Sequence, residues 1–318
     1  MKSVIFDSRK KVIPFVKHRK KFYIFTLIAT LLGIVLLSTA GLNLGIDFES
    51  GTRVEVMAEE TLTEEKVMED FSSAGQGYEP DDVTLAGESN QMAHATFIGT
   101  LTQEEIFEIQ AYFSEAYGSE PSVSTVSPQV GQELAKNAFI SVLIASLGIV
   151  IYVSIRFHYL FGISTIIALI HDAFFIIVLF SLVRFEVNVP FIAAVLTIVG
   201  YSINDTIVTF DRIRENLRAT DKIKNFDDLA YVVDLSLTQT LSRTVNTILT
   251  VIFAASAIFV FGGEAIRSFA FALLVGLIAG TYSSLFLAAQ IWTDWKWKSM
   301  QREKKKPKKQ EEELEPEI

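Results

Sequence analysis

Three charged residues stand inside long apolar segments, where a charge is expensive and therefore informative. They are Asp172, Asp205 and Arg243. A charged side chain near the middle of a transmembrane helix costs about 2.5 to 3.5 kcal/mol on insertion scales, so it needs a partner or a task. A carboxylate that gains and loses charge at this depth can favour different packings of the helices around it. We therefore predict that these three residues couple ion movement to a conformational change.

Polar side chains accompany two of these charges at the spacing of a helix face. The polar positions follow i, i+1, i+4, i+8 through Asp205 and i, i+3, i+4, i+7 from Arg243, so each set forms one stripe. Two complementary stripes can face each other, line a hydrated path and bring Arg243 against Asp205. The polar residues are Tyr201, Ser202, Asn204 and Thr209 in the first segment, and Asn246, Thr247 and Thr250 in the second.

Simpler interpretations of the same residues stay open. Arg243 can reach the membrane surface from the end of its helix. Asp205 lies about 21 Å along its helix from Phe191, well inside a bilayer, and can also act as a structural hydrogen-bonding group. His171 precedes Asp172 and suggests a relay, but adjacent residues on a helix point about 100° apart, which favours a packed polar side chain.

The remaining patterns indicate packing rather than catalysis. Gly276, Gly280 and Ser284 recur every four residues, which lets another helix approach closely. The sequence has no nucleophile elbow, phosphate-binding loop or zinc-ligand spacing, and it contains no Cys. We therefore expect no catalytic residues, no metal site, no cofactor and no enzymatic activity.

Six long apolar blocks dominate the composition. The 318 residues are 50% hydrophobic, with a mean hydropathy of +0.36. Each block is long enough to cross about 30 Å, and the first is too long for a cleaved signal segment, so six retained transmembrane helices are expected. The blocks run over residues 22–40, 138–155, 159–183, 190–210, 244–261 and 265–292.

Lys and Arg residues predict the orientation of these helices. Of the 28, we count 23 on one side: before the first block, between the second and third, between the fourth and fifth, and after the sixth. The positive-inside rule therefore places both termini in the cytoplasm. The expected divisions are a basic N-terminus (1–21), the first helix (22–43), an extracytoplasmic domain (44–136), helices two to six (137–292) with a cytoplasmic loop at 211–243, and a charged tail (293–318).

The extracytoplasmic segment has the pattern of a small folded domain. Strands are expected at 52–58, 83–86, 92–98 and 122–126. Capping-box patterns at Thr61–Glu64 and Thr102–Glu105 open two helices between them. The order βαββαβ predicts a ferredoxin-like sandwich. The fold class is thus an α-helical polytopic membrane protein with one α+β ferredoxin-like domain between helices one and two.

The cytoplasmic segments are rich in charge. After the fourth block, Asp227 is expected to cap a separate amphipathic helix at the membrane surface. The apolar face of that helix would consist of Leu229, Val233 and Leu237. The end of the tail, 304–318, turns from Lys-rich to Glu-rich without apolar periodicity and is expected to be disordered. Its basic half could contact anionic lipid or ribosomal RNA, but a solvated tail is the simpler interpretation.

Several motifs of the chain resemble the bacterial SecF proteins, which belong with the gradient-driven resistance-nodulation-division superfamily. The resemblance covers nearly the whole chain. The motifs are GIDFESGT (45–52), ALIHD (168–172), VGYSINDT (199–206) with FDRIREN (210–216), SRTVNT (242–247), FGGEAIR (261–267) and LVGLIAGTYSS (274–284). The first motif of the family usually reads GIDFTGG, so Glu49 and Ser50 depart from it, and Ser tolerates a positive φ less readily than Gly.

The resemblance implies a function and a set of partners. It implies a SecF-type subunit of the Sec translocase that acts with SecD and uses the proton-motive force in late stages of polypeptide translocation across the bacterial cytoplasmic membrane. It also implies that Asp205 and Arg243 match the ion-conducting carboxylate and arginine of the family. The implied partners are SecD, the SecYEG channel, YajC, the translocating polypeptide and the lipid bilayer, with no specific nucleic acid.

Two alternative functions share some of these features. A small-solute or ion exporter of the same superfamily would also need intramembrane charges, but such exporters usually carry twelve spans and two large external domains. A purely structural scaffold would not need the Asp and Arg stripes. Copurification with the translocon separates polypeptide export from both alternatives.

Overall fold

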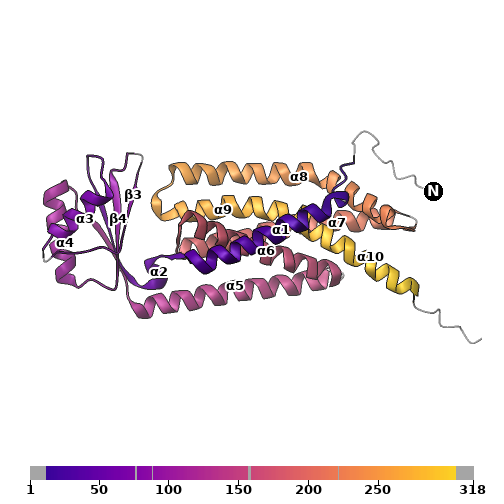
Figure 1. Ribbon diagram of the computed structural model, residues 1–318, viewed down its shortest axis with the longest axis horizontal. Helices are drawn as coiled ribbons and strands as arrows, with labels where there is room; N and C mark the ends of the chain where they lie inside the picture. Colours follow the sequence, from indigo (N-terminus) through magenta and orange to yellow (C-terminus); the bar gives the residue numbers. More distant parts are fainter. Residues whose placement is uncertain (1–11, 76, 88, 157–158, 221, 306–318) are drawn as a thin grey trace, which may run out of the picture.

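The chain forms a long helical bundle with an α/β module at one end (Figure 1). The computed structural model describes residues 12–305 except 76, 88, 157–158 and 221. Most of the tail predicted to be disordered, 306–318, therefore lies outside the described residues. A neck, residues 41–50, joins the module to the bundle and contains the short helix α2 (Ile46–Glu49).

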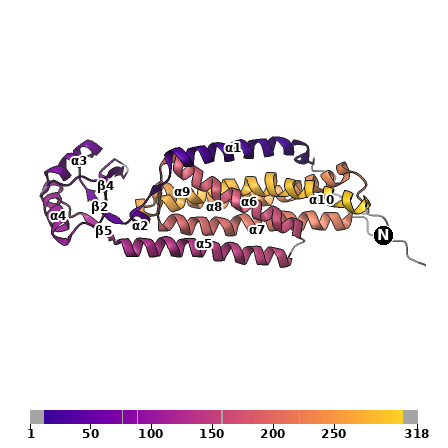
Figure 2. The same ribbon diagram turned by 60° about the horizontal axis from the view of Figure 1, so that its bottom comes forward.

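The prediction of six transmembrane helices is confirmed within the described part of the chain, where six helices are long and apolar enough to cross a membrane. The protein is thus a multi-pass membrane protein. Helix α1 runs along one side of the bundle and α5 along the other (Figure 2). The helices are α1 (Arg19–Ala40) after the turn η1 (Val16–His18), α5 (Pro128–Arg156), α6 (Tyr159–Val183), α7 (Val189–Ala219), α8 (Phe226–Phe261), and the continuous α9 (Glu264–Tyr282), η2 (Ser283–Ala288) and α10 (Ala289–Lys305).

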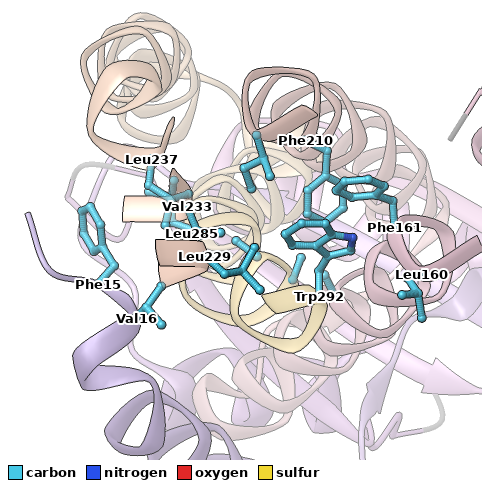
Figure 3. Close-up of a cluster of buried hydrophobic side chains, with 14 of the residues drawn as sticks. Phe15, Val16, Leu160, Phe161, Phe210, Leu229, Val233, Leu237, Leu285 and Trp292 are labelled. Atoms are coloured by element: carbon cyan, nitrogen blue, oxygen red, sulfur yellow. The ribbon is translucent and has the colours of Figure 1, made fainter. Parts of the chain in front are cut away.

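Aromatic rings join three of these helices in a buried apolar cluster (Figure 3). The ring of Phe161 on α6 stacks on Trp292 of α10, with centroids 4.5 Å apart and an interplanar angle of 10°. Phe210 of α7 packs on Phe161 at 4.7 Å. Such ring pairs contribute about 0.5–1.5 kcal/mol each beyond the area that they bury. The cluster therefore fixes the relative positions of the helices that carry the predicted ion-coupling aspartates.

Among the described residues there is no separate surface helix of the kind predicted between the fourth and fifth spans. Helices α7 and α8 continue through most of 211–243, and only residues 220–225 connect them. Asn225, not Asp227, caps α8, in a reciprocal capping box with Asp228. The apolar face of this first part of α8, Leu229, Val233 and Leu237, is buried in the cluster of Figure 3. The amphipathic pattern was read correctly, but the face packs on helices rather than on lipid.

The α/β module contains the six elements predicted for it, in the order βαββαβ. Its sheet has the strand order β3-β4-β2-β5, and each neighbouring pair is antiparallel. Alternate residues of β2, Val54 and Val56, are buried with Phe71 and Phe113 of the two helices. The elements are β2 (Gly51–Met57), α3 (Glu64–Ser73), β3 (Asp82–Ala86), β4 (Met92–Ile98), α4 (Gln103–Tyr117) and β5 (Ser122–Val126).

One of the two predicted capping boxes is present in the module. Thr102 and Glu105 bond reciprocally at the start of α4, as predicted. Helix α3 begins two residues later than expected, because Thr63 rather than Thr61 accepts the hydrogen bond of Lys66 N. The side chain of either Thr can cap a helix. Leu62 lies between them and is 1% exposed, and its burial goes with a helix that starts after Thr63.

Candidate functional site

Asp205 lies near the middle of α7, about 24 Å along the helix from Val189. Its Oδ1 accepts a hydrogen bond of 2.6 Å from Oγ1 of Thr244 on α8. Its Oδ2 is buried and has no hydrogen-bond partner among the described residues. A buried carboxylate oxygen without a donor is costly while the group is charged, and this cost falls when a cation binds. The geometry is thus suited to a group that changes its charge.

Arg243 does not form the predicted ion pair with Asp205. Arg243 is exposed on the surface of the isolated chain, and among the described ion pairs none joins it to Asp205. Adjacent residues of a helix point about 100° apart. Since Thr244 faces α7, its neighbour Arg243 must point away from the direct contact.

The two predicted polar stripes divide into exposed and buried parts. Ser202 and Thr209 are buried, Asp205 is half-buried, and Tyr201 and Asn204 are exposed. On α8, all four stripe residues are exposed, namely Arg243, Asn246, Thr247 and Thr250. The stripes therefore do not close on each other within this chain. The four exposed residues of α8 form a polar surface on a helix long and apolar enough to span a membrane, and we call this surface the α8 polar face.

Asp172 lies at the centre of a second polar cluster, in the interior of the bundle. The residue is 1% exposed. Its Oδ2 accepts hydrogen bonds from Ser202 Oγ on α7 at 2.6 Å and from Ser283 Oγ on η2 at 2.8 Å. His171 Nδ1 lies 3.2 Å from Oδ1, and the His171 ring stacks on Phe175. One carboxylate thus connects α6, α7 and η2.

Small residues let α9 approach α7 closely beside this cluster. A Cβ at Gly276 would overlap α7, and a Cβ at Gly280 would lie 3.2 Å from Cβ of Ser202. One turn further, Ser284 Oγ lies 2.8 Å from Oγ1 of Thr206. The four-residue spacing therefore brings the two helix backbones together next to Asp172.

Sequence reasoning missed two of the hydroxyl groups that bind the two aspartates, those of Thr244 and Ser283. Thr244 was overlooked because Arg243 beside it was the stronger signal. Ser283 was overlooked because it starts a π-helical segment, in which side-chain directions are shifted by one residue relative to an α-helix. Such segments are frequent at functional sites. The signal available in the sequence was the pair Ser283 and Ser284 inside an apolar block.

The family model described as "Protein export membrane protein SecD/SecF, C-terminal" matches residues 108–298 of this chain. The chain belongs to the SecD/SecF family. A second model of the family, the SecD/SecF GG motif, matches residues 35–61, which cover the end of α1, the neck and β2. The family resemblance read from the motifs is therefore confirmed.

Relatives and solved structures identify this member of the SecD/SecF family as SecF-type. The chain is 42% identical to protein translocase subunit SecF of Alicyclobacillus acidocaldarius over 90% of its own length and 94% of that relative. It is 52% identical to protein translocase subunit SecDF of Bacillus subtilis over 91% of this chain, which spans only 39% of that relative. The crystal structure of SecDF from Thermus thermophilus matches with a TM-score of 0.81 and 33% identity, over 90% of this chain and 39% of that one.

The sequence of the neck departs from the GG motif of the family at two residues, and the departure at Ser50 strains the backbone. Ser50 has φ 66° and ψ 131°, a conformation that glycine adopts readily and other residues rarely. Ser50 thus occupies a position with positive φ, which Ser tolerates less readily than the glycine that is usual in the family. Gly51 retains the motif. A Cβ at this position would overlap the carbonyl oxygen of Phe97.

Proposed function

We propose that this SecF-type chain acts with a SecD subunit to use the proton-motive force in late stages of polypeptide translocation. The observation that carries this proposal is the state of Asp205, with one oxygen bonded to Thr244 and the other buried without a partner. Proton binding neutralises the second oxygen and supplies a donor. Proton release restores a charge that favours Thr244 and the nearby Arg243. Each state thus favours a different packing of α7 on α8.

The energy of one proton limits how far such a switch can go. One charge that moves down 100 mV supplies about 2.3 kcal/mol, whereas a change from 1:99 to 99:1 requires about 5.5 kcal/mol. A second titrating group, a pH gradient or a smaller conformational bias must therefore contribute. Asp172 is our second candidate because its carboxylate joins α6, α7 and η2.

The α8 polar face supports SecD as the partner in the membrane. Polar and charged side chains at membrane depth rarely contact lipid, because burying them in hydrocarbon is costly. We propose that SecD covers this face and that the two subunits enclose Asp205 and Arg243 between them. The SecDF relatives support such a pairing. The SecYEG channel, YajC and the translocating polypeptide complete the proposed set of partners, with the rest of the surface in the lipid bilayer.

The α/β module is proposed to be a ferredoxin-like domain on the outer side of the cytoplasmic membrane. The strand order β3-β4-β2-β5 with helices between β2 and β3 and between β4 and β5 supports this assignment. The distribution of Lys and Arg supports cytoplasmic termini. In this arrangement the module meets the polypeptide as it emerges, holds it and prevents it from sliding back.

The test is gradient-dependent export in vesicles that contain this chain, a SecD subunit and the SecYEG channel. Asp205→Asn preserves volume but cannot ionise, and we expect it to abolish the part of export that depends on the gradient. Glu215→Gln removes a charge from an exposed site of the same helix and serves as the matched control. Export by Asp205→Asn that equals the control rejects the proton-carrier role. Arg243→Lys then shows whether guanidinium geometry or charge alone is required.

A further inference from the structure

The neck between the first span and the α/β module binds directly to the start of the helix that carries Asp205. We infer that the neck transmits the state of the ion site to the module, with Asp47, Arg53 and Glu186 as positioning residues. This inference rests on the proposed function. It adds the mechanical route between the membrane site and the external domain, built from three contacts.

The first contact places the Asp47 carboxylate at the N-terminus of α7. Asp47 Oδ2 accepts a hydrogen bond of 2.9 Å from Val189 N, the first residue of that helix. Asn188, the N-cap, accepts from Phe191 N at 3.1 Å. A carboxylate at a helix N-terminus is bound by both the free N–H group and the helix dipole. The neck therefore holds the end of α7 by a charge-assisted contact and moves with it.

The second contact is a short parallel strand pair. Strand β1 (Asn43–Leu44) pairs with β6 (Glu186–Val187) in the loop between α6 and α7. Gly45 N extends the pairing with a hydrogen bond of 2.9 Å to Val187 O. A Cβ at Gly45 would overlap the Glu186 carboxylate, so a larger residue here would displace that side chain. The main chain of the neck is thereby fastened to the loop before α7.

The third contact reaches into the module. Arg53 forms an ion pair with Glu186. Arg53 belongs to β2, which is hydrogen-bonded to β4 on one side and to β5 on the other. A displacement of Glu186 therefore acts on a central strand of the sheet, not on a flexible loop. The ion pair thus joins the short strand pair before α7 to a central strand of the module's sheet.

Helix α6, which carries Asp172, is attached to the same neck. Ser181 Oγ donates to Gly41 O at 2.5 Å, and Arg184 Nη1 donates to Ala40 O at 2.7 Å. The C-terminal end of α6 and the N-terminal end of α7, the helices that carry Asp172 and Asp205, thus both contact the segment that leads into β2. Both views of the ribbon show this segment and α2 at the junction of bundle and module (Figures 1 and 2).

The test measures the position of the module in the full chain bound to SecD. Because the natural sequence has no Cys, spin labels can be placed at two introduced cysteines, Leu32→Cys on α1 and Glu115→Cys on α4. Both positions are exposed. Distance distributions are recorded with and without Asp205→Asn, which imitates the protonated site. We expect Asp205→Asn to shift the distribution when the neck is intact.

The neck variants decide the inference. In the combined variant Asp47→Asn and Arg53→Gln, we expect Asp205→Asn to cause little or no shift. With Asp205 intact, the combined variant should still take up protons in vesicles. Arg53→Lys, which keeps the charge, should retain most of the shift and guards against a simple folding defect. Glu49→Gln changes an exposed carboxylate on α2, the helix that also carries Asp47, and is the matched control.

The outcomes separate the inference from the function on which it rests. A shift of equal size in the combined neck variant overturns the inference and leaves the proposed function intact. An unchanged distribution on introducing Asp205→Asn into the natural neck overturns the inference, while the export measurement on Asp205→Asn decides the proposed function separately. A shift that disappears in the neck variant but persists in Arg53→Lys and Glu49→Gln supports the transmission route.

Discussion

Thr244 donates a hydrogen bond of 2.6 Å to Oδ1 of Asp205 across the interface of α7 and α8. This contact, rather than an ion pair, determines how α8 meets the carboxylate within the chain. The hydroxyl stabilises the charged form of Asp205 without competing for the second oxygen. It therefore leaves one oxygen of the carboxylate without a donor, as the proposed proton site requires.

Removing this hydroxyl should impair gradient-dependent export. Thr244→Val keeps the shape of the side chain and leaves Asp205 without its donor. The loss of a hydrogen bond to a charged group costs about 1.5 kcal/mol or more, roughly tenfold in an equilibrium constant. Vesicle export with and without the gradient measures the effect, and Thr244→Ser, which retains the donor, is the control. Equal export by the Val and Ser variants would show that the contact has no role.

Asp172 should matter for coupling as well as for folding. Asp172→Asn weakens the acceptor for Ser202 and Ser283, at a cost of about 1–3 kcal/mol in stability. Ser283→Ala removes one donor and keeps the carboxylate. We expect the Asn variant to lose gradient-dependent export per folded molecule, and the Ala variant to keep most of it. Normal export by folded Asp172→Asn would reduce the residue to a structural one.

Close packing of α9 on α7 should make Gly276 sensitive to added volume. A Cβ at this position would overlap Ile198, so Gly276→Leu forces the helices apart. Overpacking of this kind costs typically about 1–3 kcal/mol. Gly200, on α7, has no atom within 4 Å of an added Cβ, so Gly200→Ala should be neutral or stabilising. Thermal unfolding in detergent compares the two, and equal destabilisation would contradict the packing argument.

Ser50→Gly should stabilise the neck. Relief of a backbone with φ 66° is worth about 1–3 kcal/mol, from which roughly 0.4–1 kcal/mol is lost because glycine gains freedom in the unfolded chain. A net gain of about 1 kcal/mol is expected in thermal or denaturant unfolding. Ser50→Ala keeps the strain and should show no gain. A gain in the Ala variant equal to that in the Gly variant would mean that the serine hydroxyl, not φ, is unfavourable.

The start of α4 should weaken in acid. Hydrogen bonds from the backbone N–H and the hydroxyl of Thr102 hold the pKa of Glu105 below its usual value. Because the folded pKa is lower than the unfolded one, this contribution is present above about pH 4.3 and is lost as the pH falls through the folded pKa.

Hydrogen exchange of α4 amides in the full protein measures this effect. Glu105→Gln should raise exchange near neutral pH relative to Glu104→Gln, an exposed neighbour in the same first turn. The difference should disappear in acid, once Glu105 is protonated. A difference that stays constant with pH would indicate a role for side-chain shape rather than charge.

Much of the candidate site was predictable because it depends on local chemistry. Asp205, Asp172 and Arg243 were visible as charges within apolar blocks, and Ser202 as part of a stripe. Ser202 was assigned to the wrong neighbourhood, however. It lies on the stripe of Asp205, yet its hydroxyl is committed to Asp172 on another helix. A stripe defines a direction around one helix axis, but it does not specify which helix lies in that direction.

The sequence by itself determined the six spans, the element order of the module, the cap at Thr102 and the departure from a motif glycine at Ser50. Each depends on a free energy that a short segment carries alone: transfer of an apolar helix into lipid, alternation along a strand, or the φ of one residue. Only the tertiary structure decided that Thr244 binds Asp205, that Ser283 reaches Asp172 and that Asp47 holds α7. Those contacts depend on how each helix is rotated and crossed against the others, and a change of one residue in that rotation turns a side chain by about 100°.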